Sequence, residues 1–208
     1  VWHPITLMFV RLLLAVSTLV VVWAFIEGLS SVLKAPWLKG IKIGLLGFGL
    51  GTNLLLFAQW FTDPITVALL ATLIPISATI LEVWDGRRKL NSRFILGLSA
   101  SIIGGFIAVS ENISIDLGWG VLMALGSGFC FMWASDKSVT RLSELSSIAR
   151  SSVTFTGAAV FTTISFAVFF TLGLIEIPTR LSSGQFLSLI IYSVIAMAIS
   201  QVFFYSGH

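Results

Sequence analysis

The chain has 208 residues, of which 57% are hydrophobic and only 10% are charged, with a formal net charge of +3. Soluble domains average about 25% charged residues, so a soluble protein of this composition would lack the polar side chains to cover its surface. The apolar runs are continuous, which excludes a transmembrane β-barrel with its alternating pattern. The composition predicts an all-α, polytopic membrane protein embedded in a lipid bilayer.

The remaining composition limits the classes of partner and cofactor. The basic residues lie in short segments between apolar runs, so the positive charge does not indicate a nucleic-acid partner. The lone Cys130 excludes an intramolecular disulfide and a cysteine-based metal site. We expect no cofactor and no metal, and no phosphate-binding loop of an ATP-driven motor is present.

Seven apolar runs are each close to the ~20 residues that a helix needs to cross a bilayer. A four-residue polar break separates the second run from the third, which is short enough only for an antiparallel helix pair. In chain order, the predicted helices are 5–26, 41–61, 65–83, 93–110, 117–135, 151–174 and 185–206.

The basic residues predict the orientation. If the connecting loops alternate between the two sides, ten of the twelve lysines and arginines fall on one side, and only Arg180 lies in a loop of the other. Because positive residues are retained on the cytoplasmic side, loops 27–40, 84–92 and 136–150 are predicted to be cytoplasmic. A bacterial inner membrane is the expected location. The tryptophans lie near predicted helix ends or in a loop, which is typical of interface anchors.

Small residues indicate close contacts between helices. The second predicted helix contains several glycines, Gly44 among them, and four-residue spacings of small residues recur in the fourth and fifth, as at Gly97–Ser101–Gly105 and Gly120–Ala124–Gly128. Small side chains let helix backbones approach closely in lipid. The glycine-rich helix either packs or borders a cavity.

An internal repeat is indicated by two pairs of similar segments. Residues 6–22 resemble 152–168 at a shift of 146, and 50–61 resemble 197–208 at a shift of 147. Such a period holds five helices, and an odd number inverts the second copy in the membrane. We therefore predict inverted five-helix repeats, with 1–114 as the first repeat and 115–208 as the second.

Several segments resemble the EamA-type members of the drug/metabolite transporter superfamily. They are Arg11-Leu-Leu-Leu-Ala15, Asp63-Pro-Ile-Thr-Val-Ala-Leu-Leu-Ala-Thr-Leu-Ile-Pro75, Arg88-Lys-Leu-Asn-Ser-Arg-Phe-Ile-Leu-Gly97 and Ile103-Gly-Gly105. The second half matches mainly in helix layout. One departure is Arg88, which stands where the family usually has a glutamate at the end of its fourth helix.

The resemblance implies ten helices in two inverted repeats, with both termini in the cytoplasm. The chain would then hold helices two to eight, so that the first repeat lacks its first helix and the second lacks its last two. With the observed period, a complete protein would have about 295 residues. It also implies a secondary transporter, an exporter of small metabolites such as amino acids, working by alternating access.

Candidate residues for the substrate path are the polar or helix-bending ones within apolar runs. Arg11 lies about 10 Å into its helix, and either binds an anionic or zwitterionic group or extends to the outer interface. Pro75 bends its helix, as a structural kink or as a hinge in the path. The others are Asn53, Gln59, Thr72, Ser77, Ser200 and Gln201, which either line the path or form hydrogen bonds within and between helices.

Three function classes remain open at this stage. A transporter is favoured, with a site bounded by helices 41–61, 65–83, 117–135 and 185–206, and multidrug efflux is the closest alternative. A non-transporting scaffold predicts a packed core without a polar path. An enzyme is disfavoured, because both histidines are close to the ends and no H-E-x-x-H or G-x-S-x-G is present. No acid lies at mid-membrane depth, so transport either is facilitated diffusion or takes its proton site from helices outside this sequence. A homo-oligomer is left open.

Overall fold

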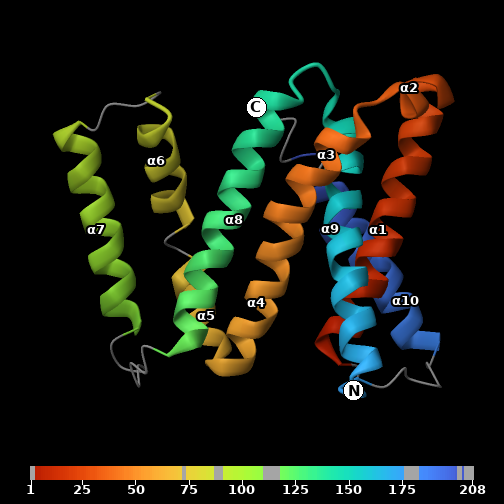
Figure 1. The fold of residues 1–208 in the computed structure, drawn as a ribbon. Coiled ribbons are helices and arrows are strands. Elements are labelled where there is room, and N and C mark those ends of the chain that lie inside the picture. Colours follow the sequence, from red (N-terminus) through yellow and green to blue (C-terminus); the bar gives the residue numbers. More distant parts are fainter. Residues whose placement is uncertain are drawn as a thin grey trace. The chain divides into compact units, whose positions relative to one another are not determined.

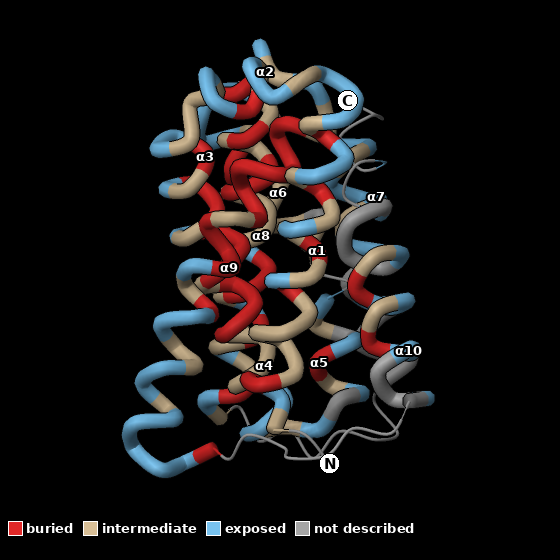
Figure 2. The backbone as a smooth tube through the Cα atoms, turned by 90° about the vertical axis from the view of Figure 1, so that its right-hand side faces the viewer, coloured by how far each residue is buried: buried red, intermediate tan, exposed pale blue. Residues whose placement is uncertain are grey.

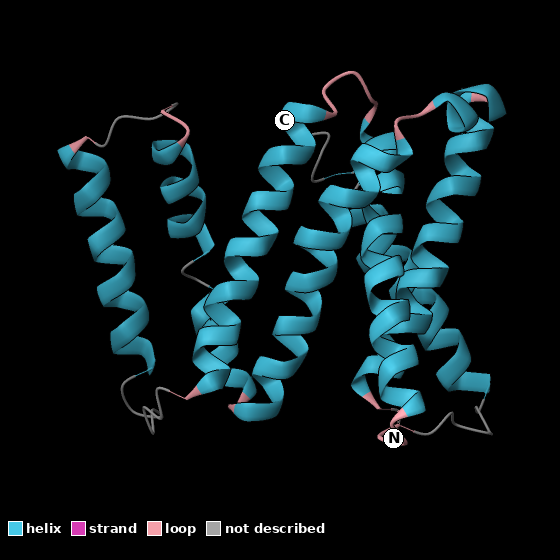
Figure 3. Ribbon diagram, viewed as in Figure 1, coloured by secondary structure: helices cyan, strands magenta, loops and turns pink. Residues whose placement is uncertain are grey.

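The computed structural model describes residues 3–71, 74–86, 91–109, 118–175, 183–200 and 203. Across these residues every regular element is a helix, which confirms the all-α prediction (Figure 3). Three helical segments are long and apolar enough to cross a membrane, Pro4–Glu27, Trp37–Phe61 and Ser147–Thr171. Together with the other apolar helices they make this an integral, multi-pass membrane protein.

Figure 1 labels the elements along the chain. They are α1 (Pro4–Glu27), α2 (Leu29–Lys34), α3 (Trp37–Ile43), the π-helical η1 (Gly44–Gly49), α4 (Leu50–Phe61), α5 (Pro64–Ala71), α6 (Ile74–Trp84), α7 (Ser92–Val109), α8 (Trp119–Arg141), α9 (Ser147–Thr171), α10 (Ser183–Ile191) and the π-helical η2 (Tyr192–Ile199). Each predicted helix therefore has a counterpart.

Two of the connections between helices are shorter in the structure than the loops predicted from the sequence. Loop 27–40 contains the whole of α2 and the start of α3. Loop 136–150 is reduced to the residues between Arg141 and Ser147, because α8 continues past its apolar run and Ser146 caps α9 by accepting a hydrogen bond from Ala149 N at 3.2 Å. The change from apolar to polar residues marks the edge of the bilayer, whereas a helix continues until a cap or turn ends it.

The chain divides into two compact units. The first comprises Val1–Leu50 and Ala134–His208, and the second comprises Gly51–Trp133. These units are defined by packing, whereas the predicted repeats are defined by symmetry. The repeat boundary near residue 114 therefore stays a prediction.

In the first unit, α9 packs against α1, α3 and η1, and much of its N-terminal half is buried (Figure 2). The closest approach is at Gly44 and Gly157. A Cβ on Gly44 would collide with the carbonyl oxygen of Thr154, and a Cβ on Gly157 would collide with that of Ile41. The helix backbones therefore touch at this crossing, as the glycine-rich run predicted. Ring stacking of Phe9 on Phe166, with centroids 4.5 Å apart, adds a contact between α1 and α9.

Three buried hydroxyl groups of α9 form hydrogen bonds within their own helix. The hydroxyls of Ser151, Ser152 and Thr154 each donate to a carbonyl oxygen four residues earlier at 2.8 Å. Such back-bonding lets a helix bury hydroxyls without a polar partner on a neighbouring helix. These residues are therefore part of the packed core.

The core of the second unit contains Ala58, Val67 and Ala124. A Cβ on Gly120 would lie 3.1 Å from the carbonyl oxygen of Ala58, so α8 and α4 are in close contact there. Among the described residues, no atom lies within 4 Å of where a Cβ on Gly97 of α7 would be. The spacing of small residues thus correctly predicted a contact at Gly120, whereas no described residue makes one at Gly97, because the spacing does not reveal which helix face meets a neighbour.

Candidate functional site

Arg11 lies two turns into α1, a helix with a well-defined start. His3 precedes it, and the Nδ1 of His3 accepts a hydrogen bond from Ile5 N at 3.3 Å, while Pro4 occupies the first helical position. Proline is favoured there because its missing N–H has no partner in a helix. At 1.5 Å per residue, Arg11 lies about 10 Å beyond this start. Its charge is therefore within a membrane-spanning segment.

The structure brings Arg11 against an aromatic residue from the other end of the chain. The guanidinium carbon lies 3.8 Å from the centroid of the Tyr192 ring, which is the first residue of η2. This is the geometry of a cation–π contact. Arg11 is partly buried, and its Nε is inaccessible to solvent and has no hydrogen-bond partner among the described residues. Tyr192 is 52% exposed.

The packing of α1 against α10 and η2 positions this pair. Leu12 and Ala15 are buried on α1, and Leu189 and Ser193 are buried on the partner helix. The hydroxyl of Ser193 donates to the carbonyl oxygen of Leu189 at 2.7 Å, so it needs no partner on α1. Arg11 directly precedes the buried Leu12, and Tyr192 directly precedes the buried Ser193. The pair therefore lies at the margin of the contact between α1 and the helix formed by α10 and η2.

Two helices contain π-helical segments that sequence reasoning missed. The N–H of Leu50 bonds to the carbonyl of Leu45 after η1, and the N–H of Ser200 bonds to that of Ile195 after η2. Both bonds span five residues, against four in an α-helix. Because π-helical segments often occur at functional sites, their positions bear on function. No local sequence pattern distinguishes them from α-helix.

The remaining predicted residues are distributed over both units. Asn53 on α4 is 3% exposed, whereas Gln59, six residues later, is exposed, so the two amides lie on different faces of one helix. Ser77 on α6 is partly buried, and Ser200 after η2 is exposed. Thr72 and Gln201 lie outside the described residues.

The structure does not test the prediction that Pro75 lies in the middle of a helix. Helix α5 is described as far as Ala71 and α6 is described from Ile74, and residues 72 and 73 lie outside the described residues. The bend or hinge at Pro75 therefore stays a prediction.

Sequence reasoning placed Arg150 in a polar loop, and this was wrong. Arg150 is 8% exposed near the start of α9, and its Nη2 donates to the carbonyl oxygen of Leu145 at 3.2 Å. Nearby in the same unit, Lys137 forms an ion pair with Asp136 at 3.0 Å. The sequence did not predict that α9 begins at Ser147, because the charged residues of this segment are typical of a loop.

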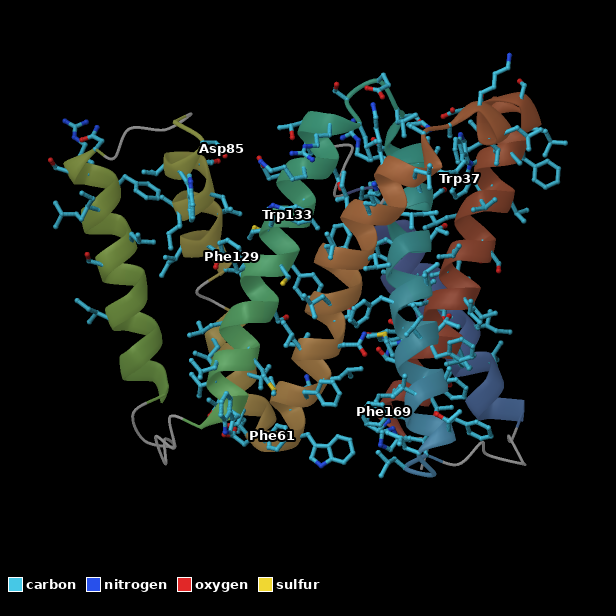
Figure 4. All side chains as sticks on the ribbon, in the orientation of Figure 1. Trp37, Phe61, Asp85, Phe129, Trp133 and Phe169 are labelled. Atoms are coloured by element: carbon cyan, nitrogen blue, oxygen red, sulfur yellow. The ribbon has the colours of Figure 1, made fainter. Side chains whose placement is uncertain are left out.

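The contact between Arg11 and Tyr192 therefore defines the candidate site. Most of the side-chain atoms drawn in Figure 4 are carbon. Among the described residues, no cluster of three or more metal-ligating side chains occurs. The chemistry available is the recognition of a negative charge by a guanidinium.

Comparisons with known proteins give two findings. The sequence model of the EamA-like transporter family matches residues 1–110. A crystal structure of a protein that is 15% identical superposes with a TM-score of 0.73, over 96% of this chain and 68% of that chain. This likeness shows a shared fold. Comparison with curated proteins finds no significant match.

Proposed function

Since the chain belongs to the EamA-like transporter family, whose model matches more than half of its residues, we propose that it exports small zwitterionic metabolites such as amino acids. Membrane transport of the drug/metabolite transporter type follows from the family. We propose three further points: the substrate class, the outward direction of transport, and alternating access as the mechanism. The observation that carries it is the state of Arg11.

Arg11 requires a negative partner. A charged side chain within a membrane-spanning helix is costly unless it is paired or faces water. The Nε of Arg11 has no hydrogen-bond partner among the described residues. Because Nε is inaccessible to solvent, a carboxylate would approach the two Nη groups, where two parallel hydrogen bonds are the preferred geometry for this pair of groups. The carboxylate of an amino acid meets this requirement.

The Tyr192 ring leaves these donors available. A guanidinium is planar, and its N–H groups point outward in that plane. The guanidinium carbon lies 3.8 Å from the centroid of the Tyr192 ring. A cation–π contact is not a conventional hydrogen bond, so it leaves the hydrogen bonding of the guanidinium to other groups. An aromatic face beside a carboxylate site also suits the apolar part of a small zwitterion.

The two π-helical segments support the repeat on which alternating access depends. When η1, Gly44–Gly49, is shifted by the 147 residues found in the sequence, it falls on 191–196, which overlaps η2, Tyr192–Ile199. Inverted repeats that rock about a central site are the common plan of secondary transporters. A shared irregularity at related positions is consistent with that plan, and Tyr192 lies within it.

The test is transport of a labelled amino-acid panel by the full-length protein in proteoliposomes, with and without an imposed pH gradient. We expect equilibration of at least one amino acid without a gradient. Arg11→Gln should lower its initial rate more than tenfold, since a charge-assisted, bidentate contact is lost. Ser17→Ala on the same helix is the control, because the Ser17 hydroxyl is exposed and donates to the carbonyl oxygen of Leu13 in its own helix.

Elution as a single species and an unchanged circular dichroism spectrum would establish that the Arg11→Gln protein is folded. Transport of no amino acid by the wild-type protein, under either condition, would contradict the proposed substrate class. Equal rates for the folded Arg11→Gln and wild-type proteins would contradict the role of Arg11.

A further inference from the structure

The connection between α1 and α3, residues 25–42, is a short structured segment that we call the α2 corner. Gly28 has φ of +84°, a conformation that favours glycine, and this ends α1 and lets α2 start directly afterwards. Pro36 follows α2 and precedes α3. Glu27 and Trp37 are the ends of two membrane-spanning segments, so the α2 corner lies at a membrane surface.

Two tryptophans hold the α2 corner in place. The Nε1 of Trp37 donates to the carbonyl oxygen of Val32 at 2.7 Å, and the Trp23 ring lies 5.8 Å from that of Trp37. Trp23 is 1% exposed, and its Nε1 donates to the Glu27 carboxylate at 2.9 Å. Figure 4 labels Trp37 at the start of α3. One face of the α2 corner therefore packs against these tryptophans, and this packing determines which side chains lie on the opposite, outward face.

The outward face of the α2 corner is apolar. Leu29 and Leu33, which are four residues apart and share a face of α2, are 70% and 80% exposed. Phe25 at the end of α1 is 86% exposed, and Leu38 on α3 is 76% exposed. Side chains of this size at the end of a membrane-spanning helix favour the boundary between acyl chains and headgroups.

Positive charge accompanies this apolar face. Lys34, Lys39 and Lys42 are all exposed. The one acidic residue between positions 25 and 42 is Glu27, whose carboxylate accepts from Trp23, so the three lysines leave a net charge of +2. Lysines beside inserted apolar side chains lie level with lipid phosphates.

We infer that the α2 corner is a binding surface for anionic phospholipids. Leu29, Leu33 and Phe25 enter the headgroup boundary, and the ammonium groups of Lys34 and Lys39 pair with the phosphate groups of the adjacent leaflet. The partner is the lipid surface itself, recognised by negative charge. Each lysine near an anionic surface contributes about a fivefold increase in affinity.

The experiment places the full-length protein in bilayers of phosphatidylcholine with one-fifth phosphatidylglycerol, extracts it gently, and measures the retained lipids by mass spectrometry. We expect phosphatidylglycerol to be enriched over its bulk fraction. Lys34→Gln/Lys39→Gln should return the retained phosphatidylglycerol close to its bulk fraction. Arg93→Gln/Arg141→Gln removes the same charge from exposed positions elsewhere and should leave the enrichment unchanged.

A second measurement separates charge recognition from recognition of one headgroup. When phosphatidylserine replaces phosphatidylglycerol, the same enrichment is expected, and raising the salt concentration should reduce it. The absence of enrichment in the wild-type protein, equal losses in the two double variants, or enrichment of phosphatidylglycerol alone would each overturn the inference. Single Lys34→Gln and Lys39→Gln proteins replace the double variant if it does not fold.

Discussion

Arg11 contacts the Tyr192 ring, and its Nε has no hydrogen-bond partner in the part of the chain that the structure describes. Arg11 could be selected as a candidate from the sequence, because a charge within an apolar run is costly, and its role stays a prediction. Its contact with Tyr192 could not be predicted, because the two residues are far apart along the chain and meet through the packing of α1 against η2. The amides were less predictable still, since burial of Asn53 and exposure of Gln59 depend on the helix face.

The Tyr192 ring should contribute to substrate affinity through its face. Tyr192→Phe keeps the ring, so we expect the KM for transport to stay within about twofold of the wild-type value. Tyr192→Leu removes the ring, and we expect KM to rise about fivefold, as an exposed cation–π contact contributes at this level. The check is initial transport rates over a range of substrate concentrations. A Tyr192→Phe protein as impaired as Tyr192→Leu would assign the effect to the hydroxyl.

A second prediction concerns Asp63, which lies in the loop before α5. The hydroxyl of Thr66 donates to one oxygen of the Asp63 carboxylate, and the Thr66 N–H donates to the other at 2.9 Å. These hydrogen bonds lower the pKa of Asp63 below its ordinary value. The stabilisation that they give is therefore present above that ordinary value, and is lost as the pH falls through the lowered pKa.

Thr66→Val removes the hydroxyl and keeps the N–H, so the pKa of Asp63 should rise while remaining below the ordinary value. Titration of the carboxyl carbon by NMR in detergent micelles measures this directly. An Asp63 pKa that is the same in both proteins would contradict the assignment of the hydroxyl bond as the largest cause.

At the scale of elements, the hydrophobic runs predicted where the long helices occur. They did not predict the short or irregular helical segments, whose structure depends on packing. The α2 helix was missed because six residues give too short a pattern, and its orientation depends on the Trp37 contact with Val32. The π-helical segment η1 was missed because it lies where the backbones of Gly44 and Gly157 touch. Such irregularities arise from contacts between helices rather than from local sequence.

The crossing of η1 and α9 should tolerate no side chain at Gly44. A Cβ there would collide with the backbone oxygen of Thr154, which cannot move aside like a flexible side chain. We expect Gly44→Ala to destabilise the protein by about 1–3 kcal/mol, as overpacked cores do. Gly97→Ala is the matched control, because its Cβ would meet no atom of a described residue within 4 Å, and alanine is the better helix former.

Thermal unfolding in detergent, followed by loss of the monodisperse species, compares the two variants. The melting temperature should fall for Gly44→Ala and stay the same or rise for Gly97→Ala. A Gly44→Ala protein as stable as the wild type would mean that the two helices do not approach this closely in the membrane.

At the scale of the whole molecule, composition predicted a multi-pass membrane protein and the resemblance predicted its family, and both are confirmed. The repeat boundary, the number of helices in a complete protein and the sidedness of the loops stay predictions. The repeat boundary and the helix number depend on the symmetry between repeats, and the sidedness depends on insertion into the membrane. Packing between neighbouring helices determines none of them.

Sidedness can be tested on one helical segment. Leu38 and Phe61 are exposed, and they lie near the two ends of the candidate membrane span Trp37–Phe61. In a Cys130→Ala background, Leu38→Cys should react with a membrane-impermeant maleimide only from the cytoplasmic side, and Phe61→Cys only from the outside. The reverse pattern would contradict the orientation, and labelling of both from one side would contradict the span.

The most direct measurement of the central claim, that Arg11 binds the carboxylate of a small zwitterion, compares transport of an amino acid with that of its primary amide. The amide has nearly the same size and lacks the negative charge. The wild-type protein should prefer the amino acid by more than tenfold, and a folded Arg11→Gln protein should lose most of that preference. A preference that persists undiminished in the Arg11→Gln protein would show that another group recognises the substrate.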